Sequence, residues 1–130
     1  CGLEKRIRLI EGYLPGARLP REHYDAVISN SLLHHLVDPM VLWETIGTKG
    51  RPGAPVFVMD LMRPESREEA QALTDTYAAG EPEVLRHDFY HSLLAAYRPE
   101  EVREQLIRAG LTLQVKTVGD RHFVVSGQLQ

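Results

Sequence analysis

Short apolar runs recur along the chain and predict strands. Residues 6–10 alternate in part between arginine and β-branched or leucine side chains, which favours a strand ending near Glu11. Residues 24–29 and 55–59 are compact apolar runs, typical of strands that are buried on both faces of a parallel sheet. Each run is followed by polar or turn-forming residues, so the first half of the chain is predicted to contain three strands.

Helical patterns lie between and after these runs. Asp38 followed by Pro39 predicts a helix start, and Ser66 with Glu69 predicts a second one through a capping box. Apolar side chains then repeat every three or four residues, as expected for one face of a helix. The repeating positions are Val41, Leu42, Trp43 and Ile46; then Ala70, Leu73 and Tyr77; then Leu85, Phe89, Leu93 and Tyr97.

The end of the chain predicts one more helix and a hairpin. Pro99 opens a helix that Gly110 closes. Residues 111–118 and 122–126 are strand-like and flank the turn Gly119-Asp120-Arg121. Early strands separated by helices predict an α/β fold with a parallel sheet, to which the final hairpin adds antiparallel strands. Ligands of such sheets bind at the carboxyl ends of the strands, at residues 11–13, 29–31 and 60–62 here.

Composition limits the class of protein. The 130 residues are enough for one domain or a piece of one, and 43% hydrophobic with 25% charged residues is a globular composition. A net charge of −3 argues against nucleic-acid binding, and no apolar run approaches the roughly 20 residues that span a bilayer. The single cysteine and the absence of a signal peptide favour a cytoplasmic location. Because the sequence starts without Met, we expect that a segment upstream is absent.

The stretch from residue 24 to 39, Tyr-Asp-Ala-Val-Ile-Ser-Asn-Ser-Leu-Leu-His-His-Leu-Val-Asp-Pro, resembles the fourth strand and following loop of class I S-adenosylmethionine-dependent methyltransferases. The similar enzymes are the small-molecule type that includes quinone-biosynthesis enzymes. Residues 49–60 resemble the lysine-proline-glycine turn and fifth strand of that family, and residues 99–110 resemble its last helix. The resemblance implies a Rossmann-like methyltransferase sheet over residues 1–130, from the third strand onward, with a helical insert at about 64–98.

The same resemblance implies where S-adenosylmethionine contacts the chain. The residues it places at the cofactor are Gly12, Tyr13, Leu14, Asn30, Ser31, Leu32 and His35. The family's first two strands, its Gly-x-Gly-x-Gly loop and the acidic residue that holds the ribose have no counterpart here, and Tyr13 stands where an aspartate usually faces the adenine. For Asn30 and Ser31 the alternative is local turn bonding, which both residue types favour.

Residues for catalysis and for the methyl acceptor follow from the same pattern. His34 and His35 are the first candidates for a general base if the acceptor must lose a proton, and simple packing is the alternative for both. Asp60, at the end of the fifth-strand-like run, either orients the acceptor or is a solvated carboxylate that caps the next turn. The insert is expected to add His87, His91 and Tyr97 to the acceptor pocket. His87 and His91 have the spacing of a zinc pair, but without a third ligand we expect no metal.

The predicted function is methyl transfer to a small-molecule acceptor when the N-terminal half is present, with these residues alone inactive. The alternative is a non-catalytic half-domain that serves as an interaction or dimerisation module. Another doubly wound enzyme, such as an oxidoreductase, is disfavoured by the Leu-His-His loop and by the lack of a Tyr-x-x-x-Lys pair. In the family the sheet order is 3-2-1-4-5-7-6, so the strand at 24–29 is expected to expose one edge. Either the strand at 6–10 moves beside this edge, or two copies of the chain join there; we expect the homodimer, because prolines in the intervening loop limit refolding.

Overall fold

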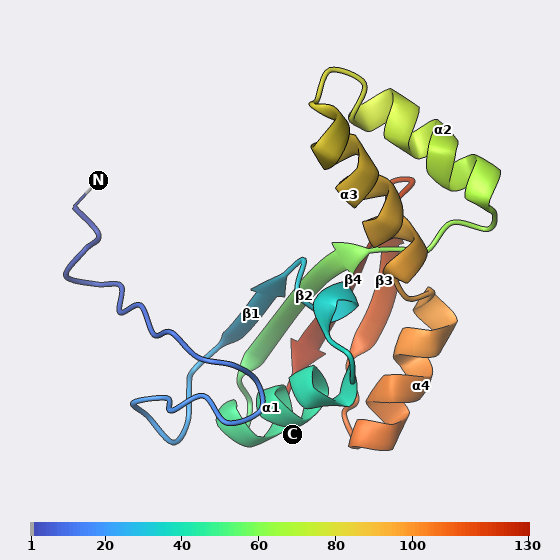
Figure 1. The fold of residues 1–130 in the computed structure, drawn as a ribbon. Helices are drawn as coiled ribbons and strands as arrows, with labels where there is room; N and C mark the ends of the chain where they lie inside the picture. Colours follow the sequence, from blue (N-terminus) through green and yellow to red (C-terminus); the bar gives the residue numbers. More distant parts are fainter. Residues whose placement is uncertain (1) are drawn as a thin grey trace.

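The computed structural model of the protein describes residues 2–130 and contains one four-stranded sheet (Figure 1). Its strands are β1 (Val27–Asn30), β2 (Pro55–Leu61), β3 (Gln114–Val118) and β4 (His122–Gln128), in the order β1-β2-β4-β3. β1 and β2 are parallel, whereas β4 is antiparallel to both β2 and β3. This arrangement confirms the predicted α/β class, and its strand order corresponds to 4-5-7-6 of the methyltransferase sheet.

The helices begin and end close to the predicted signals. They are α1 (Met40–Lys49), α2 (Arg67–Tyr77), α3 (Glu83–Ala95), α4 (Pro99–Ala109) and the short 3-10 helix η1 (Leu33–His35). The Asp38 carboxylate accepts the Met40 N–H at 3.0 Å, the Ser66 hydroxyl accepts the Glu69 N–H at 3.1 Å, and Gly110 ends α4 at φ 71°. No helix among residues 2–130 combines the length and apolar composition needed to cross a bilayer.

The main core lies on one face of the sheet, which we call the covered face. Alternate residues of β2 and β4 point into it, and the apolar sides of α1 and α4 pack over them. Between the two helices the Trp43 Nε1–H donates to the buried Gln105 Oε1 at 2.8 Å. The strand residues of the covered face are Val56, Val58, Val115, Phe123 and Val125.

The opposite side of the sheet is the open face, defined by Ile28 and Phe57. These two residues are neighbours in the β1–β2 register and are 80% and 46% exposed. Burial on both faces, predicted for residues 24–29 and 55–59, is therefore wrong for the described chain, because no helix among residues 2–130 covers Ile28 and Phe57 is only half-buried. The strand is also shorter than predicted, with Tyr24 forming only an isolated bridge to Gly50.

The predicted strand at residues 6–10 is wrong. No helix or strand lies between residues 2 and 23, and this segment runs away from the sheet at the blue end of the ribbon (Figure 1). The N–H groups of Arg6 and Ile7 both donate to the Leu3 carbonyl in a turn, and Leu9 is 91% exposed. An alternating pattern gives a strand only where another strand pairs with it, and none does so here.

Helices α2 and α3 pack on each other beyond the carboxyl end of β2, in the stretch predicted as a helical insert (Figure 1). Their small core comprises Leu61, Ala70, Leu73, Leu93 and Ala96. The predicted apolar stripe is only partly buried, since Tyr77 and Leu85 are 45% and 48% exposed. Two helices that cover only one end of a sheet leave their outer sides in solvent.

Candidate active site

The carboxyl ends of β1 and β2 meet at one edge of the sheet, where the family resemblance places the site. β1 ends at Asn30, and the next N–H, that of Ser31, donates to the Met59 carbonyl at 2.9 Å. Ser31 has φ 57°, a left-handed backbone conformation that costs a non-glycine residue about 1–2 kcal/mol. This turn leaves Asn30 and Ser31 exposed and directs the chain into η1.

Asp60 and His34 form a buried pair directly below that turn. Asp60 is 1% exposed, and its Oδ1 lies 2.5 Å from His34 Nδ1. The carboxylate also accepts the His34 N–H at 3.2 Å and the Leu61 N–H at 2.7 Å. The solvated, turn-capping role considered for Asp60 is therefore wrong: strand alternation points it inward with Val56 and Val58, where a carboxylate needs hydrogen-bond donors.

An open cavity of about 440 Å³ lies between η1 and α3, and four histidines are among the residues that line it. The His34 and His35 ring centroids are 4.0 Å apart, and those of His87 and His91 are 4.2 Å apart. The structure thus brings together two histidine pairs more than 50 positions apart in the sequence. We call this space the histidine cavity; Asp88, Ser92 and Ala95 complete its lining.

The histidine cavity is not arranged around a metal ion. Within residues 2–130, no three side chains of His, Cys, Asp or Glu are placed to hold one. His87 and His91 face the cavity from successive turns of α3, and the nearest carboxylate oxygen to His87, on Asp88, is 3.9 Å from its Nδ1. The rings instead offer nitrogen donors and acceptors, together with flat apolar faces, to an organic molecule.

Several predicted site residues lie elsewhere. Gly12 and Tyr13 are exposed, and Leu14 lines a shallow cavity along α1 with Val41. No hydrogen bond joins these residues to the Asn30 turn, so their cofactor role stays a prediction. Tyr97 packs against the main core, and burial followed by the nearby Glu101 carboxylate raises its pKa.

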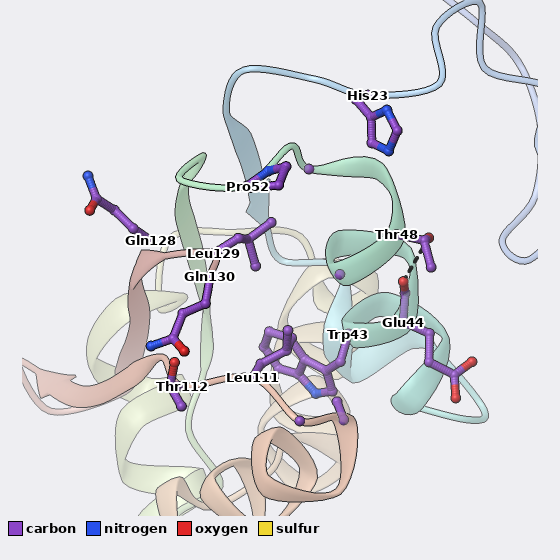
Figure 2. A pocket seen from close by; sticks show the side chains of 14 residues that line it. His23, Trp43, Glu44, Thr48, Pro52, Leu111, Thr112, Gln128, Leu129 and Gln130 are labelled. Atoms are coloured by element: carbon purple, nitrogen blue, oxygen red, sulfur yellow. Dashed lines mark hydrogen bonds between the residues drawn. The ribbon is translucent and has the colours of Figure 1, made fainter.

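A second cavity, of about 520 Å³, lies at the opposite end of the sheet (Figure 2). It is lined by Trp43 and Thr48 of α1, by Gly110 and Thr112 around the end of α4, and by the last residues of the chain. In Figure 2 the Thr48 hydroxyl donates to the Glu44 carbonyl at 2.9 Å, so this group is already used within its own helix. Parallel α/β sheets bind ligands at the carboxyl ends of their strands, which favours the histidine cavity instead.

Sequence inspection missed Asp88 and Ser92, and it missed the pairing of Asp60 with His34. Asp88 and Ser92 each follow a predicted pocket histidine by one position, so both were detectable as neighbours on α3. The burial of Asp60 was detectable from the two-residue period of β2. Its partner was not, because a pairing across 26 positions depends on how η1 folds back.

No protein-family model matches the chain. Uncharacterized methyltransferases of Mycobacterium bovis and Mycobacterium tuberculosis are 28% identical to it over 100 residues, which cover 77% of this chain and 51% of each relative. The chain thus spans about half the length of these curated relatives.

Solved structures give the same picture of the fold. A SAM-dependent methyltransferase from Aquifex aeolicus matches with a TM-score of 0.67 at 20% identity, over 97% of this chain and 56% of the other. Human N-acetylserotonin methyltransferase, solved in complex with SAM, matches with a TM-score of 0.55 at 18% identity, over 86% and 31%. These 130 residues therefore carry part of the S-adenosylmethionine-dependent methyltransferase fold and are related in sequence to proteins named as methyltransferases.

Proposed function

We propose that the chain takes part in methyl transfer from S-adenosylmethionine to a small-molecule acceptor. The cofactor lies against the turn from Asn30 to Leu32, and the acceptor lies in the histidine cavity. The observation that carries the proposal lies at the carboxyl ends of β1 and β2 in a methyltransferase-type sheet. An exposed polar turn lies there next to a cavity of organic-ligand size.

The turn suits the polar part of the cofactor by the chemistry of its groups. The Asn30 amide and the Ser31 hydroxyl are exposed, and the half-buried Leu32 follows them. The Ser31 hydroxyl donates to Asn30 Oδ1 at 3.4 Å, a long local bond of the kind expected for a turn, which a cofactor group would have to replace. When bound, S-adenosylmethionine supplies a methyl group already activated by its sulfonium sulfur. The chain's own task is to orient the acceptor against that methyl group, which provides much of the rate enhancement in such displacements.

Affinity for the cofactor is expected to be weak in these residues alone. They contain no Gly-x-Gly-x-Gly loop, and each missing hydrogen bond to a charged group costs about 1.5–3 kcal/mol. Calorimetry with the 130-residue chain should give a dissociation constant of millimolar or weaker, whereas micromolar affinity would show that the site is complete without that loop.

Two experiments test the location of the site. In ¹⁵N-labelled chain, millimolar S-adenosylmethionine should shift the amide resonances of residues 30–32 and leave those of residues 127–130 unchanged. In a chimera that joins this chain to the half of the Mycobacterium tuberculosis relative that it does not match, Asn30→Ala should lower methyl transfer at least tenfold. Gln128→Ala, which removes an exposed amide at the second cavity, is the matched control. Equal effects of the two substitutions would place the site elsewhere.

A non-catalytic role is the second candidate, favoured by the open face and by the free edge of β1. A sheet edge with unpaired backbone groups is a template for another chain. Methyl transfer by the chimera would exclude this role as the principal one.

A further inference from the structure

We propose that the acceptor carries a neutral group with several hydroxyls, of the glycosyl type, and that this group binds between α2 and α3, beside the histidine cavity. This inference rests on the proposed function and adds to it the part of the acceptor that determines specificity.

The site is an open cavity of about 410 Å³, which we call the α2–α3 cavity. It lies between the two helices of the insert, which pack on each other, and its volume is in the usual range for ligand pockets. His87 lines both this cavity and the histidine cavity, so the two adjoin at its side chain. The other lining residues all carry polar side chains: Gln71, Thr74, Glu81, Glu83, Arg86 and Tyr90.

Ring contacts also connect the two cavities. Tyr90 lines the α2–α3 cavity, and its ring meets that of His91 edge-on, with centroids 5.3 Å apart. His91 lines the histidine cavity and contacts the His87 ring, with centroids 4.2 Å apart. Three aromatic side chains of α3 therefore form a continuous row, along which one ligand reaches both cavities.

One carboxylate orients two polar side chains of the α2–α3 cavity. Asp75 Oδ1 accepts from Gln71 Nε2 at 3.0 Å and from Arg86 Nη2 at 3.1 Å. With its amide nitrogen used in this way, Gln71 keeps Oε1 as an acceptor. A guanidinium has several N–H groups, and the bond to Asp75 is the only one that Arg86 makes within residues 2–130. Its Nε–H is buried without a partner among these residues, whereas the side chain as a whole is 41% exposed.

The charges of the lining select the class of ligand. Two carboxylates, on Glu81 and Glu83, lie in it with one guanidinium, on Arg86. The carboxylates repel an anion, and the guanidinium repels a cation. A hydroxyl both donates and accepts, so it is the neutral group that matches a mixed set of donors and acceptors. Several hydroxyls on one ring match the side chains of two helices at once, which points to a glycosyl group.

The first test compares two probes that differ in charge at one position, phenyl β-glucoside and phenyl β-glucuronide. In ¹⁵N-labelled 130-residue chain at about pH 7.5, where histidines are mostly neutral, millimolar phenyl glucoside should shift the amide resonances of residues 81–91. The resonances of residues 127–130, at the second cavity, should stay unchanged. The glucuronide should bind at least about fivefold more weakly, because its carboxylate meets two others. No shift at residues 81–91, or equal affinity for the two probes, overturns the proposal.

The second test changes the lining. Glu81→Gln combined with Glu83→Gln should raise the affinity for the glucuronide at least about threefold and change that for the glucoside less than about twofold. Glu68→Gln combined with Glu104→Gln makes the same change in net charge at exposed positions outside both cavities and is the matched control. The same gain in the control pair would show an effect of net charge alone and overturn the proposal.

Glycoside binding and cofactor binding are measured separately. A response of residues 81–91 to the glucoside, without any response of residues 30–32 to S-adenosylmethionine, would overturn the proposed function and leave the α2–α3 cavity as a glycoside site. The opposite result would overturn the present inference and leave the proposed function standing.

Discussion

The two faces of the sheet differ although the same strands form both. Phe123 on the covered face is fully buried, whereas Phe57 on the open face is 46% exposed. Both are phenylalanines in neighbouring paired strands, so strand propensity does not distinguish them. The difference shows that burial in this chain comes from the helices α1 and α4, and that the pleat only decides which residues meet them.

The largest expected effect comes from this matched pair of residues. Phe123→Ala should lower the free energy of unfolding by about 3–5 kcal/mol, because it leaves a cavity beneath the helices. Phe57→Ala should cost about 1 kcal/mol, because half of the ring is already in water. Urea denaturation of both variants measures the contrast. Similar losses would mean that the open face is covered in solution.

Polar groups on the covered face sharpen the comparison, since they require partners. Trp43→Phe removes the donor to Gln105 Oε1 and should cost about 1–3 kcal/mol beyond the lost volume. Adding Gln105→Leu should recover part of that loss, because the unpaired amide is gone. A double-mutant cycle with no coupling between the two positions would contradict this account.

The partly buried His122, the first residue of β4, is expected to make the stability of the fold depend on pH. Burial, followed by the nearby Arg121, lowers its pKa below the usual 6.5. The folded state therefore binds the proton less readily than the unfolded state, and stability should fall as pH drops through 6.5 towards the lowered value. His122→Gln should flatten this part of the stability profile measured between pH 7.5 and roughly pH 5, the range in which histidines titrate. His23→Gln, at an exposed position, should leave it unchanged.

A substitution on the open face should affect self-association of the chain more than its free energy of unfolding. Ile28→Lys should change the free energy of unfolding by less than about 0.5 kcal/mol, as usual for exposed positions. If two copies join along β1, the same substitution should weaken the dimer seen by sedimentation velocity across a concentration series. A wild-type chain that stays monomeric at every concentration would argue against the expected homodimer.

The same contrast explains what the sequence predicts well. Helix starts at Asp38 and Ser66 and the closing hairpin follow from local signals and are confirmed. The strand expected at residues 6–10 fails because an apolar alternation carries no information about whether a partner strand is present. The histidines and Asp60 were named one by one, but their assembly into a cavity depends on α3 crossing η1, a contact between segments about 50 positions apart.

The place of β4 in the sheet has a consequence for how the chain is made. This strand, the last along the sequence, lies between β2 and β3 and joins the parallel pair to the hairpin. During synthesis from the N-terminus, β2 cannot form its antiparallel pairing until residues 122–128 have left the ribosome, so its backbone groups on that side stay unpaired although α1 and α4 precede β4 in the chain. Nascent chains released before residue 122 are thus expected to be targets for chaperones and proteases, whereas loss of residues 2–23 leaves every strand pairing intact.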